Sequence, residues 1–437
     1  MTRRRTMRID RRRWLSSVGG SVGGLAGLTA GRQAGGEEVE NVENVGDASM
    51  LRCKGLLAGS LIGDALGGPL EFADEATLAA ATRRGDVAGV RQWSDPVLGT
   101  DAMRRLSDSL RLPEYSVYRR AAAPYGPWMD NAPAGTITDD SRMKIVLLRA
   151  MEDANQRQQT IAPEDVARAL VEFQCRRDQA DSPAVAALCR EGLREYRYAA
   201  RWLIGDRDRS VALPVDRLWS GVANCSGQMM MLPLAIVHAG DPVAAYERCY
   251  RMDFVDHGYA KDFAAAVVAG LAAVVGRSPD GLTTDQRWGL FRDTIRKTDP
   301  MRLAEVPFAG RPLVGWLDLA EEIVDRCDGN VVELFGRLET DGRPVYYWDA
   351  HFTFAVAMTM VGFCHRYPLA ALGLSIDFGH DTDSYGQLVG AIVGAIHGAD
   401  VFPDELFAPV RDAMANQYGE SIDRWLGILF SQRAMAF

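Results

Sequence analysis

Glycine recurs at every fourth position in two distant segments of this 437-residue sequence, residues 55–67 and residues 386–398. A glycine inside a helix costs about 0.5–1 kcal/mol relative to alanine, so a series at helical spacing requires a compensating gain. Close packing of helix backbones supplies such a gain. We therefore predict that both segments are buried helices at the centre of the fold, packed against each other or against neighbouring helices, with their ends close together. The two series are Gly55, Gly59, Gly63, Gly67, Gly386, Gly390, Gly394 and Gly398.

The rest of the chain from Met50 onward also carries a helical pattern. Windows rich in alanine, leucine and valine are long, and alternating runs typical of strands are few. No fixed repeat period is present, which argues against a solenoid. We predict an all-α fold, a single compact multi-helix domain over residues 50–437, with a proline- and glycine-rich loop insertion at about residues 83–135. The predicted helices cover residues 50–66, 139–154, 163–179, 183–203, 228–239, 241–251, 258–276, 284–297, 314–326, 330–338, 350–366, 368–375, 383–398 and, in pieces, 403–431.

Residues 1–36 have the order of an export signal. Eight arginines lie in this segment, and seven of them precede a weakly apolar run from Val18 to Ala30, which small residues follow. The sequence Arg-Arg-Arg-Trp-Leu at 11–15 resembles the twin-arginine pattern. We expect this leader to send the protein out of the cytoplasm by the twin-arginine route. The alternative is a basic tail on a cytoplasmic protein.

Charge and composition exclude several classes of function. The formal net charge is −9, although the first 36 residues are strongly basic, so no basic face for nucleic acid is expected. The apolar runs at 263–276 and 385–399 are shorter than a membrane span, so no stable membrane insertion is expected. Seven cysteines form no CxxC pair and six histidines form no HExxH pattern, so no zinc motif is present.

Three short segments gather acids and hydroxyls among apolar neighbours. They are GDALGGPLE at residues 63–71, GTITDDS at 135–141 and GHDTDS at 379–384. Taken singly, the second and third are ordinary starts of helices, with first-turn acids that complement the helix dipole. Together they open predicted buried helices, where carboxylates would repel each other strongly unless cations lay between them. Oxygen ligands of this kind suit Mg²⁺, or alternatively Mn²⁺, and the number of acids indicates two divalent cations.

The order of these motifs resembles the ADP-ribosylglycohydrolase family. GDALGxPLEF near the start, TDD at the opening of a helix, and GxDTDS before a helix rich in glycine and alanine occur in the family's order over residues 50–400. The resemblance implies an all-α domain with a binuclear metal centre in a cleft. It implies that Glu71 lies at the metal centre and is catalytic, and we expect either Glu71 or Asp139 to transfer the proton. We expect Gly379 and His380 to bind substrate and Asp64 to be structural. The implied metal ligands are Thr138, Asp139, Asp140, Asp381, Asp383 and Ser384.

The sequence departs from the family pattern at three places. Ser384 stands where threonine is commoner, which keeps the hydroxyl ligand. His380 replaces a frequent glycine, and the family's middle motif is only loosely visible at residues 224–229.

The activity implied by the resemblance is hydrolysis of the glycosidic bond between ADP-ribose and its acceptor, on an ADP-ribosylated protein or a small conjugate. Three alternatives remain open. They are a non-catalytic ADP-ribose-binding or structural protein on the same fold, a hydrolase of another ribosyl or nucleoside-like conjugate, and a phosphohydrolase that uses Asp381 and Asp383.

Overall fold

The structure of the protein is a computed structural model. It describes residues 47–73, 78, 103–104, 107, 110, 133–173, 193–276, 281–307, 310–364 and 366–436. All of these belong to one compact unit, Val42–Phe437. The predicted leader at 1–36 lies outside the described residues, as does most of the predicted insertion at 83–135.

Within the described ranges every regular element is a helix and no strand occurs, which confirms the predicted all-α fold. An isolated antiparallel bridge joins Asn224 and Asp349. Among the described helices, none combines the length and the apolarity needed to cross a bilayer.

The α-helices are α1 (Asp47–Gly67), α4 (Asp139–Gln156), α5 (Pro163–Glu172), α7 (Arg194–Leu203), α8 (Ser226–Met230), α9 (Leu234–Val237), α10 (Pro242–Met252), α11 (Ala260–Val275), α12 (Thr284–Lys297), α13 (Pro312–Cys327), α14 (Val331–Gly342), α15 (Ala350–Cys364), α16 (Pro368–Asp377), α17 (Thr382–His397), α18 (Asp404–Tyr418) and α19 (Ile422–Ala436). Short 3₁₀ turns are η2 (Gly68–Leu70), η5 (Val215–Gly221), η7 (Leu303–Glu305) and η8 (Ala399–Val401).

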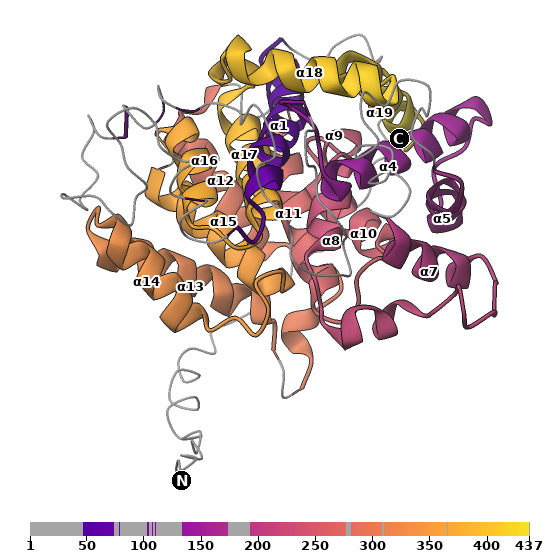
Figure 1. The fold of residues 1–437 in the computed structure, drawn as a ribbon, viewed down its shortest axis with the longest axis horizontal. Coiled ribbons are helices and arrows are strands. Elements are labelled where there is room, and N and C mark those ends of the chain that lie inside the picture. Colours follow the sequence, from indigo (N-terminus) through magenta and orange to yellow (C-terminus); the bar gives the residue numbers. More distant parts are fainter. Residues whose placement is uncertain are drawn as a thin grey trace, which may run out of the picture. The chain divides into compact units, whose positions relative to one another are not determined.

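The two glycine series pack directly against each other in α1 and α17, which lie side by side in the middle of the helices (Figure 1). A Cβ atom on Gly59 would lie 2.0 Å from the carbonyl oxygen of Gly390, and one on Gly63 would lie 1.9 Å from that of Gly386. The pairing runs in opposite directions along the two segments, so the helices are antiparallel. The two helix backbones are therefore so close that only glycine fits between them. Of the two packings that the sequence left open, the glycine series pack against each other and not against neighbouring helices.

Gly398 differs from the other members of the series. It ends α17 with a φ of 93°, in the region that favours glycine, and a Cβ placed on it would meet the Leu51 side chain at an ordinary 3.7 Å. Gly398 is therefore a helix-terminating glycine, and α17 packs through Gly386, Gly390 and Gly394.

The antiparallel arrangement brings the end of α1 to the start of α17. The Thr382 hydroxyl donates a hydrogen bond to the Gly67 carbonyl oxygen at 2.7 Å, and the Phe72 amide donates one to the His380 carbonyl oxygen at 2.7 Å. The first and third acid segments of the sequence consequently meet at one end of the helix pair.

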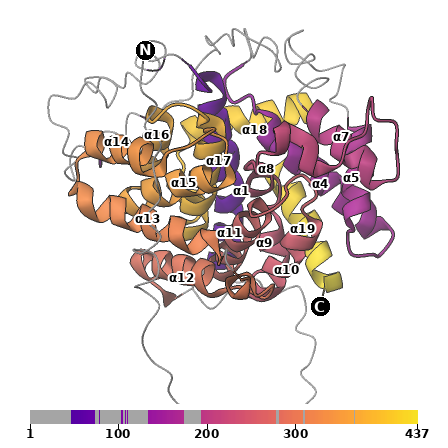
Figure 2. The ribbon, with the colours of Figure 1, turned by 90° about the horizontal axis from the view of Figure 1, so that it is seen from below.

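The other helices cover this pair on two sides. Helices α12 to α16 lie on one side, and α4, α5 and α7 lie on the other (Figures 1 and 2). Nearly every residue of α11 is buried, so this helix runs through the core. Its apolar sequence after Lys261 and Asp262 follows from that burial, since a helix that is hydrophobic all round has no solvent face.

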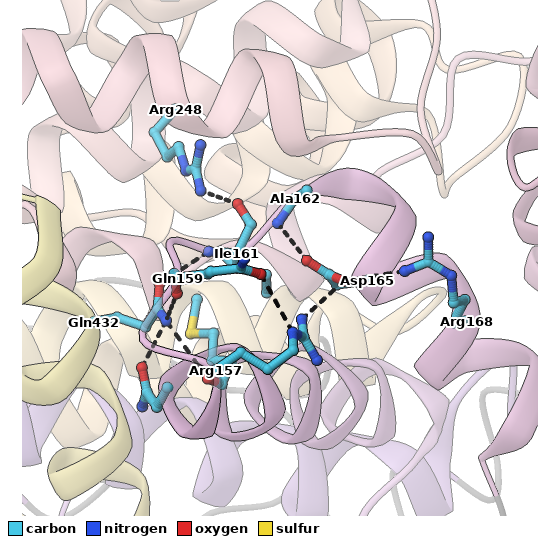
Figure 3. Close-up of polar contacts among 10 residues, drawn as sticks. Arg157, Gln159, Ile161, Ala162, Asp165, Arg168, Arg248 and Gln432 are labelled. Carbon is cyan, nitrogen blue, oxygen red and sulfur yellow. Dashed lines mark hydrogen bonds and ion pairs between the residues drawn. The ribbon is translucent and has the colours of Figure 1, made fainter.

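The segment between α4 and α5 is tied to the C-terminal helix. The Asp165 carboxylate accepts hydrogen bonds from the Ala162 amide at 2.9 Å and from Arg157 at 3.0 Å (Figure 3). Gln432 of α19 accepts a hydrogen bond from the Ile161 amide at 3.1 Å. These contacts fix the end of α4 that lies far from the acid segments.

Three predicted helices differ from the observed ones. The helix predicted at 183–203 is observed as α7, which begins at Arg194 after the non-helical Leu193, and residues 183–192 lie outside the described ranges. The single helix predicted at 228–239 is divided into α8 and α9, because Pro233 has no amide hydrogen and cannot continue the helical hydrogen bonding. The helix predicted at 163–179 ends at Glu172, where the next residue is extended, and residues 174–179 lie outside the described ranges.

Candidate metal centre

Three buried carboxylates meet beside the junction of α1 and α17. Glu71 follows η2, Asp381 is the residue before α17, and Asp383 lies in its first turn. Each offers one oxygen, and these oxygens all lie within 4.8 Å of one another. Each of the three side chains is buried, so the charges lie in a region of low dielectric. Segments far apart in the sequence thus form one acidic cluster.

Helix α4 adds the second acid segment to this cluster. The Ser384 hydroxyl donates a hydrogen bond to an oxygen of Asp140 at 2.9 Å. Thr138 caps the helix by accepting a hydrogen bond from the Asp140 amide at 3.3 Å. Asp139 is the first residue of α4 and is partly buried. All three acid segments singled out in the sequence therefore reach the same place.

Asp64 holds the start of α4 against α1. Its carboxylate accepts a hydrogen bond from the Thr138 hydroxyl at 2.6 Å and another from the Thr138 amide at 3.1 Å. Burial raises the pKa of Asp64, while Lys144 and the hydrogen bonds from Ser141 and Thr138 lower it. These contacts fit the structural role expected of Asp64, since they position Thr138 and the acids after it.

The acids of the cluster oppose each other's ionisation. Burial is the largest cause that raises the pKa of Asp383, followed by the charges of Glu71, Asp140 and Asp381. The pKa of Asp140 is also raised well above its usual range, by burial first and then by the charge of Asp139. Negative charge is in excess here, and a bound cation would offset the repulsion between the ionised carboxylates. The donor set, which consists of carboxylates and hydroxyls, fits a hard divalent cation.

A buried lysine lies behind the acids, one turn along α4 from Asp140. The Lys144 ammonium donates a hydrogen bond to the side-chain carbonyl of Gln387 and lies 3.4 Å from the Ser141 hydroxyl. Burial lowers the pKa of Lys144 to about 8, against the attraction of Asp64 and Asp140. Lys144 is not among the residues predicted for the site, although a lysine four residues after Asp140 within an apolar helix is a signal that the sequence contains. The single positive charge of Lys144 is too small to balance the negative charges of the acidic cluster.

Gly379 and His380, the predicted substrate-binding residues, form the turn before α17. Both have positive φ, 84° and 65° respectively. The His380 ring stacks on that of Tyr347 with the ring centroids 3.5 Å apart, and its Nε2 atom lies 3.3 Å from the Glu339 carboxylate. The His380 side chain is thus half-buried beside the acids and directed toward Tyr347. Its role in substrate binding stays a prediction.

Comparison with known proteins identifies the family. The sequence profile of ADP-ribosylglycohydrolase matches residues 47–435. The chain belongs to the ADP-ribosylglycohydrolase family. A solved structure described as an ADP-ribosylglycohydrolase-related protein complex is 16% identical, with a TM-score of 0.49, over 89% of this chain and 99% of the other. None of the curated proteins compared with the chain matches it.

Family membership supports a hydrolase, a glycohydrolase of this superfamily whose members usually depend on metal. The family that the motif order suggested is therefore confirmed. Glu71, Asp381 and Asp383 are the buried acids that fit such a metal.

Cys225 belongs to the site and was not predicted from the sequence. It precedes α8, and its sulfur lies 3.7 Å from Asp381 Oδ2 and 3.6 Å from Ser384 Oγ. Cys225 is one of five buried cysteines among the described residues. The available signal was the place of Cys225 in residues 224–229, the segment in which the family's middle motif is only loosely visible.

Two further acids, Asp253 and Asp256, fix the start of α8. The Gly227 amide donates a hydrogen bond to Asp256 at 2.9 Å, and a Cβ on Gly227 would lie 2.3 Å from Asp253 Oδ2. Burial is the largest cause that raises the pKa of each acid. Asp253 and Asp256 therefore hold Cys225 in place through the helix that follows it.

Proposed function

We propose that the protein is a metal-dependent hydrolase that cleaves the glycosidic bond between ADP-ribose, or a related ribosyl group, and its acceptor. The observation that carries this proposal is the group of buried oxygens from Glu71, Asp381 and Asp383, within 4.8 Å of one another in a member of this family. A structural role alone does not account for so many buried acids, because each would cost free energy to ionise without a cation.

The proposed cofactors are two divalent cations, Mg²⁺ or alternatively Mn²⁺, since both prefer oxygen ligands. The proposed ligands are Thr138, Asp139, Asp140, Asp381, Asp383 and Ser384. When bound, the cations supply positive charge that orients the ribose hydroxyls and offsets the charge of the acids.

Glu71 is the proposed general base. Its carboxylate is buried within the acidic cluster. There it accepts a proton from the water whose oxygen attacks the anomeric carbon of the ribose, while the bond from that carbon to the acceptor breaks. The proton returns to the acceptor as it leaves. The neighbouring carboxylates stabilise the positive charge that develops on the ribose ring in the transition state. Asp139 is the second candidate for the proton transfer.

The substrate proposed is an ADP-ribosylated protein or a small ADP-ribosyl conjugate. The proposed substrate-binding residues are Gly379 and His380, which directly precede Asp381 in the chain, and His380 stacks on Tyr347. Backbone amides at helix starts and glycine turns are suitable donors for a pyrophosphate, which an acidic protein does not attract by its overall charge.

The experiment that tests the function measures free ADP-ribose released from Arg-linked and Ser-linked ADP-ribosyl peptides. The full chain is assayed with Mg²⁺, with a chelator, and as Asp381→Ala; exposed Asp423→Ala is the matched control. We expect release that requires metal, is abolished in Asp381→Ala and is unchanged in Asp423→Ala. Binding of ADP-ribose without any release would instead favour the non-catalytic alternative, and release that survives in Asp381→Ala would contradict the proposed centre.

We also propose that residues 1–36 direct export by the twin-arginine route. The support is the order of basic, apolar and small residues. Residues 1–36 fused to a folded reporter should carry it out of the cytoplasm, and Arg11→Lys combined with Arg12→Lys should retain it. Equal export of both fusions would reject the twin-arginine route.

A further inference from the structure

Cys225 places a sulfur atom against two of the proposed metal ligands. The thiol is buried, with its residue 5% exposed, and its sulfur lies 3.7 Å from Asp381 Oδ2 and 3.6 Å from Ser384 Oγ. The site described so far contains only oxygen donors, which is the set expected for Mg²⁺. A soft sulfur ligand adjoining hard oxygens changes which cations the site can hold.

The distances fit one cation shared by the sulfur and both oxygens. In a tetrahedral zinc site, with sulfur at about 2.3 Å and oxygen at about 2.0–2.2 Å from the metal, a sulfur and an oxygen ligand are about 3.6 Å apart. The sulfur of Cys225 has this separation from both Asp381 and Ser384. Both sulfur–oxygen separations therefore match those expected between ligands of one tetrahedral cation.

A further hydroxyl lies near the sulfur, on α15. Thr353 is fully buried and close enough to Cys225 for its hydroxyl to interact with the thiol. Its oxygen has no well-aligned hydrogen-bond partner among the described residues. A buried hydroxyl in that state is unusual, because buried polar groups are almost always hydrogen-bonded. A cation between Thr353 and the Cys225 sulfur would satisfy it.

We infer that the protein has a mixed sulfur and oxygen site in which Cys225, Asp381, Ser384 and Thr353 bind a thiophilic divalent cation such as Zn²⁺ or Cd²⁺. The thiol loses its proton to solvent when its sulfur binds the cation. Because Asp381 and Ser384 also belong to the proposed Mg²⁺ centre, the two kinds of cation compete. The inference rests on the proposed function only for this competition.

The test titrates the full chain with Cd²⁺ and records the ultraviolet charge-transfer absorption of a cadmium thiolate. Three variants are compared with the unchanged chain: Cys225→Ser, Thr353→Val and the control Cys364→Ser. Cys364 is a suitable control because it is also buried, and burial alone raises its pKa. Mn²⁺ affinity is measured on the same samples.

We expect Cys225→Ser to lose the absorption and to bind Cd²⁺ at least about tenfold more weakly, as is typical when a metal loses a close contact. Its Mn²⁺ affinity should change less than about threefold, which also shows that the site is folded. Thr353→Val should keep the absorption but weaken Cd²⁺ binding, and Cys364→Ser should behave as the unchanged chain. Excess Mg²⁺ should reduce the absorption.

The inference is overturned if Cys225→Ser keeps both the absorption and the Cd²⁺ affinity, even where Mn²⁺ binding and ADP-ribose release support the proposed function. Conversely, Cd²⁺ binding through Cys225 without ADP-ribose release would support the mixed site and reject the hydrolase. A folded chain that binds neither Cd²⁺ nor Mn²⁺ would reject both.

Discussion

A single polar and buried residue of this protein can hold together two helices that are far apart in the sequence. Asp64 lies inside α1, fully buried, yet its carboxylate accepts hydrogen bonds from the amide and the hydroxyl of Thr138 at the start of α4. A buried carboxylate is costly unless its oxygens are hydrogen-bonded, and Thr138 supplies that compensation. One side chain therefore fixes where α4 begins relative to α1.

Asp64→Ala tests that role. It removes the acceptor for the amide and the hydroxyl of Thr138 and leaves a cavity, so we expect the free energy of unfolding to fall by about 2–4 kcal/mol. Asp64→Asn, which keeps one acceptor oxygen, should lose less. Urea denaturation measures both changes. If Asp64→Ala stays within about 0.5 kcal/mol of the unchanged protein, Asp64 does not hold α4 in place.

His238 should make stability depend on pH. Burial lowers the pKa of His238 to about 4, from 6.5 when unperturbed. Between those values the unfolded chain binds a proton that the folded chain does not, so the free energy of unfolding falls as pH decreases from 6.5 to 4. His238→Gln should reduce that slope by up to about 1.4 kcal/mol per pH unit. Urea denaturation at several pH values measures the slope, and identical slopes would show that His238 is not buried as a neutral group.

At the scale of helices, the contact between α1 and α17 determines where the other elements can go. Its glycines let two backbones touch, and that contact brings the end of one helix to the start of the other. A site assembled at the ends of two tightly packed helices is held rigidly, which suits ligands that must keep fixed distances.

The effect of the contact between α1 and α17 on stability can be distinguished from the general effect of alanine in a helix by comparing Gly59→Ala with Gly336→Ala. A Cβ on Gly59 would lie 2.0 Å from the Gly390 carbonyl oxygen, whereas one on Gly336 in α14 meets nothing within 4 Å. We expect Gly59→Ala to destabilise the fold by more than about 3 kcal/mol and Gly336→Ala to stabilise it by about 0.5–1 kcal/mol. Thermal or urea unfolding checks both, and a similar effect of the two substitutions would contradict the packing.

Most helices were predictable because their signals are local. α12 has the predicted bounds, residues 284–297, since Thr283 and Gln286 form a capping box and two basic residues end the helix. The division of α8 from α9 also has a local cause, Pro233, which a prediction from the apolar pattern alone overlooks. Cys225 could not be placed in the same way, because Asp381, its neighbour in the fold, is 156 positions away in the sequence.

At the scale of the whole molecule, the centre joins the beginning, the middle and the end of the domain. Glu71, Asp140 and Asp383 come from three distant segments. Their sequence positions say nothing of their separation, and among the residue patterns only the glycine series gave a long-range constraint. That constraint was enough to expect the first and third segments together, whereas the approach of α4, which depends on Asp64, was expected only from the family resemblance.

Asp383→Asn should raise the free energy of unfolding in the absence of metal and should reduce the stabilisation that Mg²⁺ provides. Burial and the neighbouring acids raise the pKa of Asp383, so its charge at neutral pH destabilises the metal-free fold. We expect the variant without metal to gain on the order of 1 kcal/mol in the free energy of unfolding. The unchanged protein should gain about 2.7 kcal/mol at Mg²⁺ a hundredfold above its Kd, and the variant should lose most of this gain. Thermal unfolding with Mg²⁺ and with a chelator measures both, and an Mg²⁺ effect that persists undiminished in Asp383→Asn would exclude Asp383 as a ligand.

The most direct test of the centre is the number of Mn²⁺ ions bound, counted by calorimetry with one variant for each chain segment. We predict two ions on the unchanged chain, and weaker or fewer ions on Asp140→Asn and Asp383→Asn, which lose a proposed ligand. Glu71→Gln should also weaken binding, because it removes a negative charge within 4.8 Å of the oxygens of Asp381 and Asp383. A common loss would show that three distant segments hold one metal centre. A folded chain that binds no Mn²⁺, or variants that bind it as the unchanged chain does, would contradict the account.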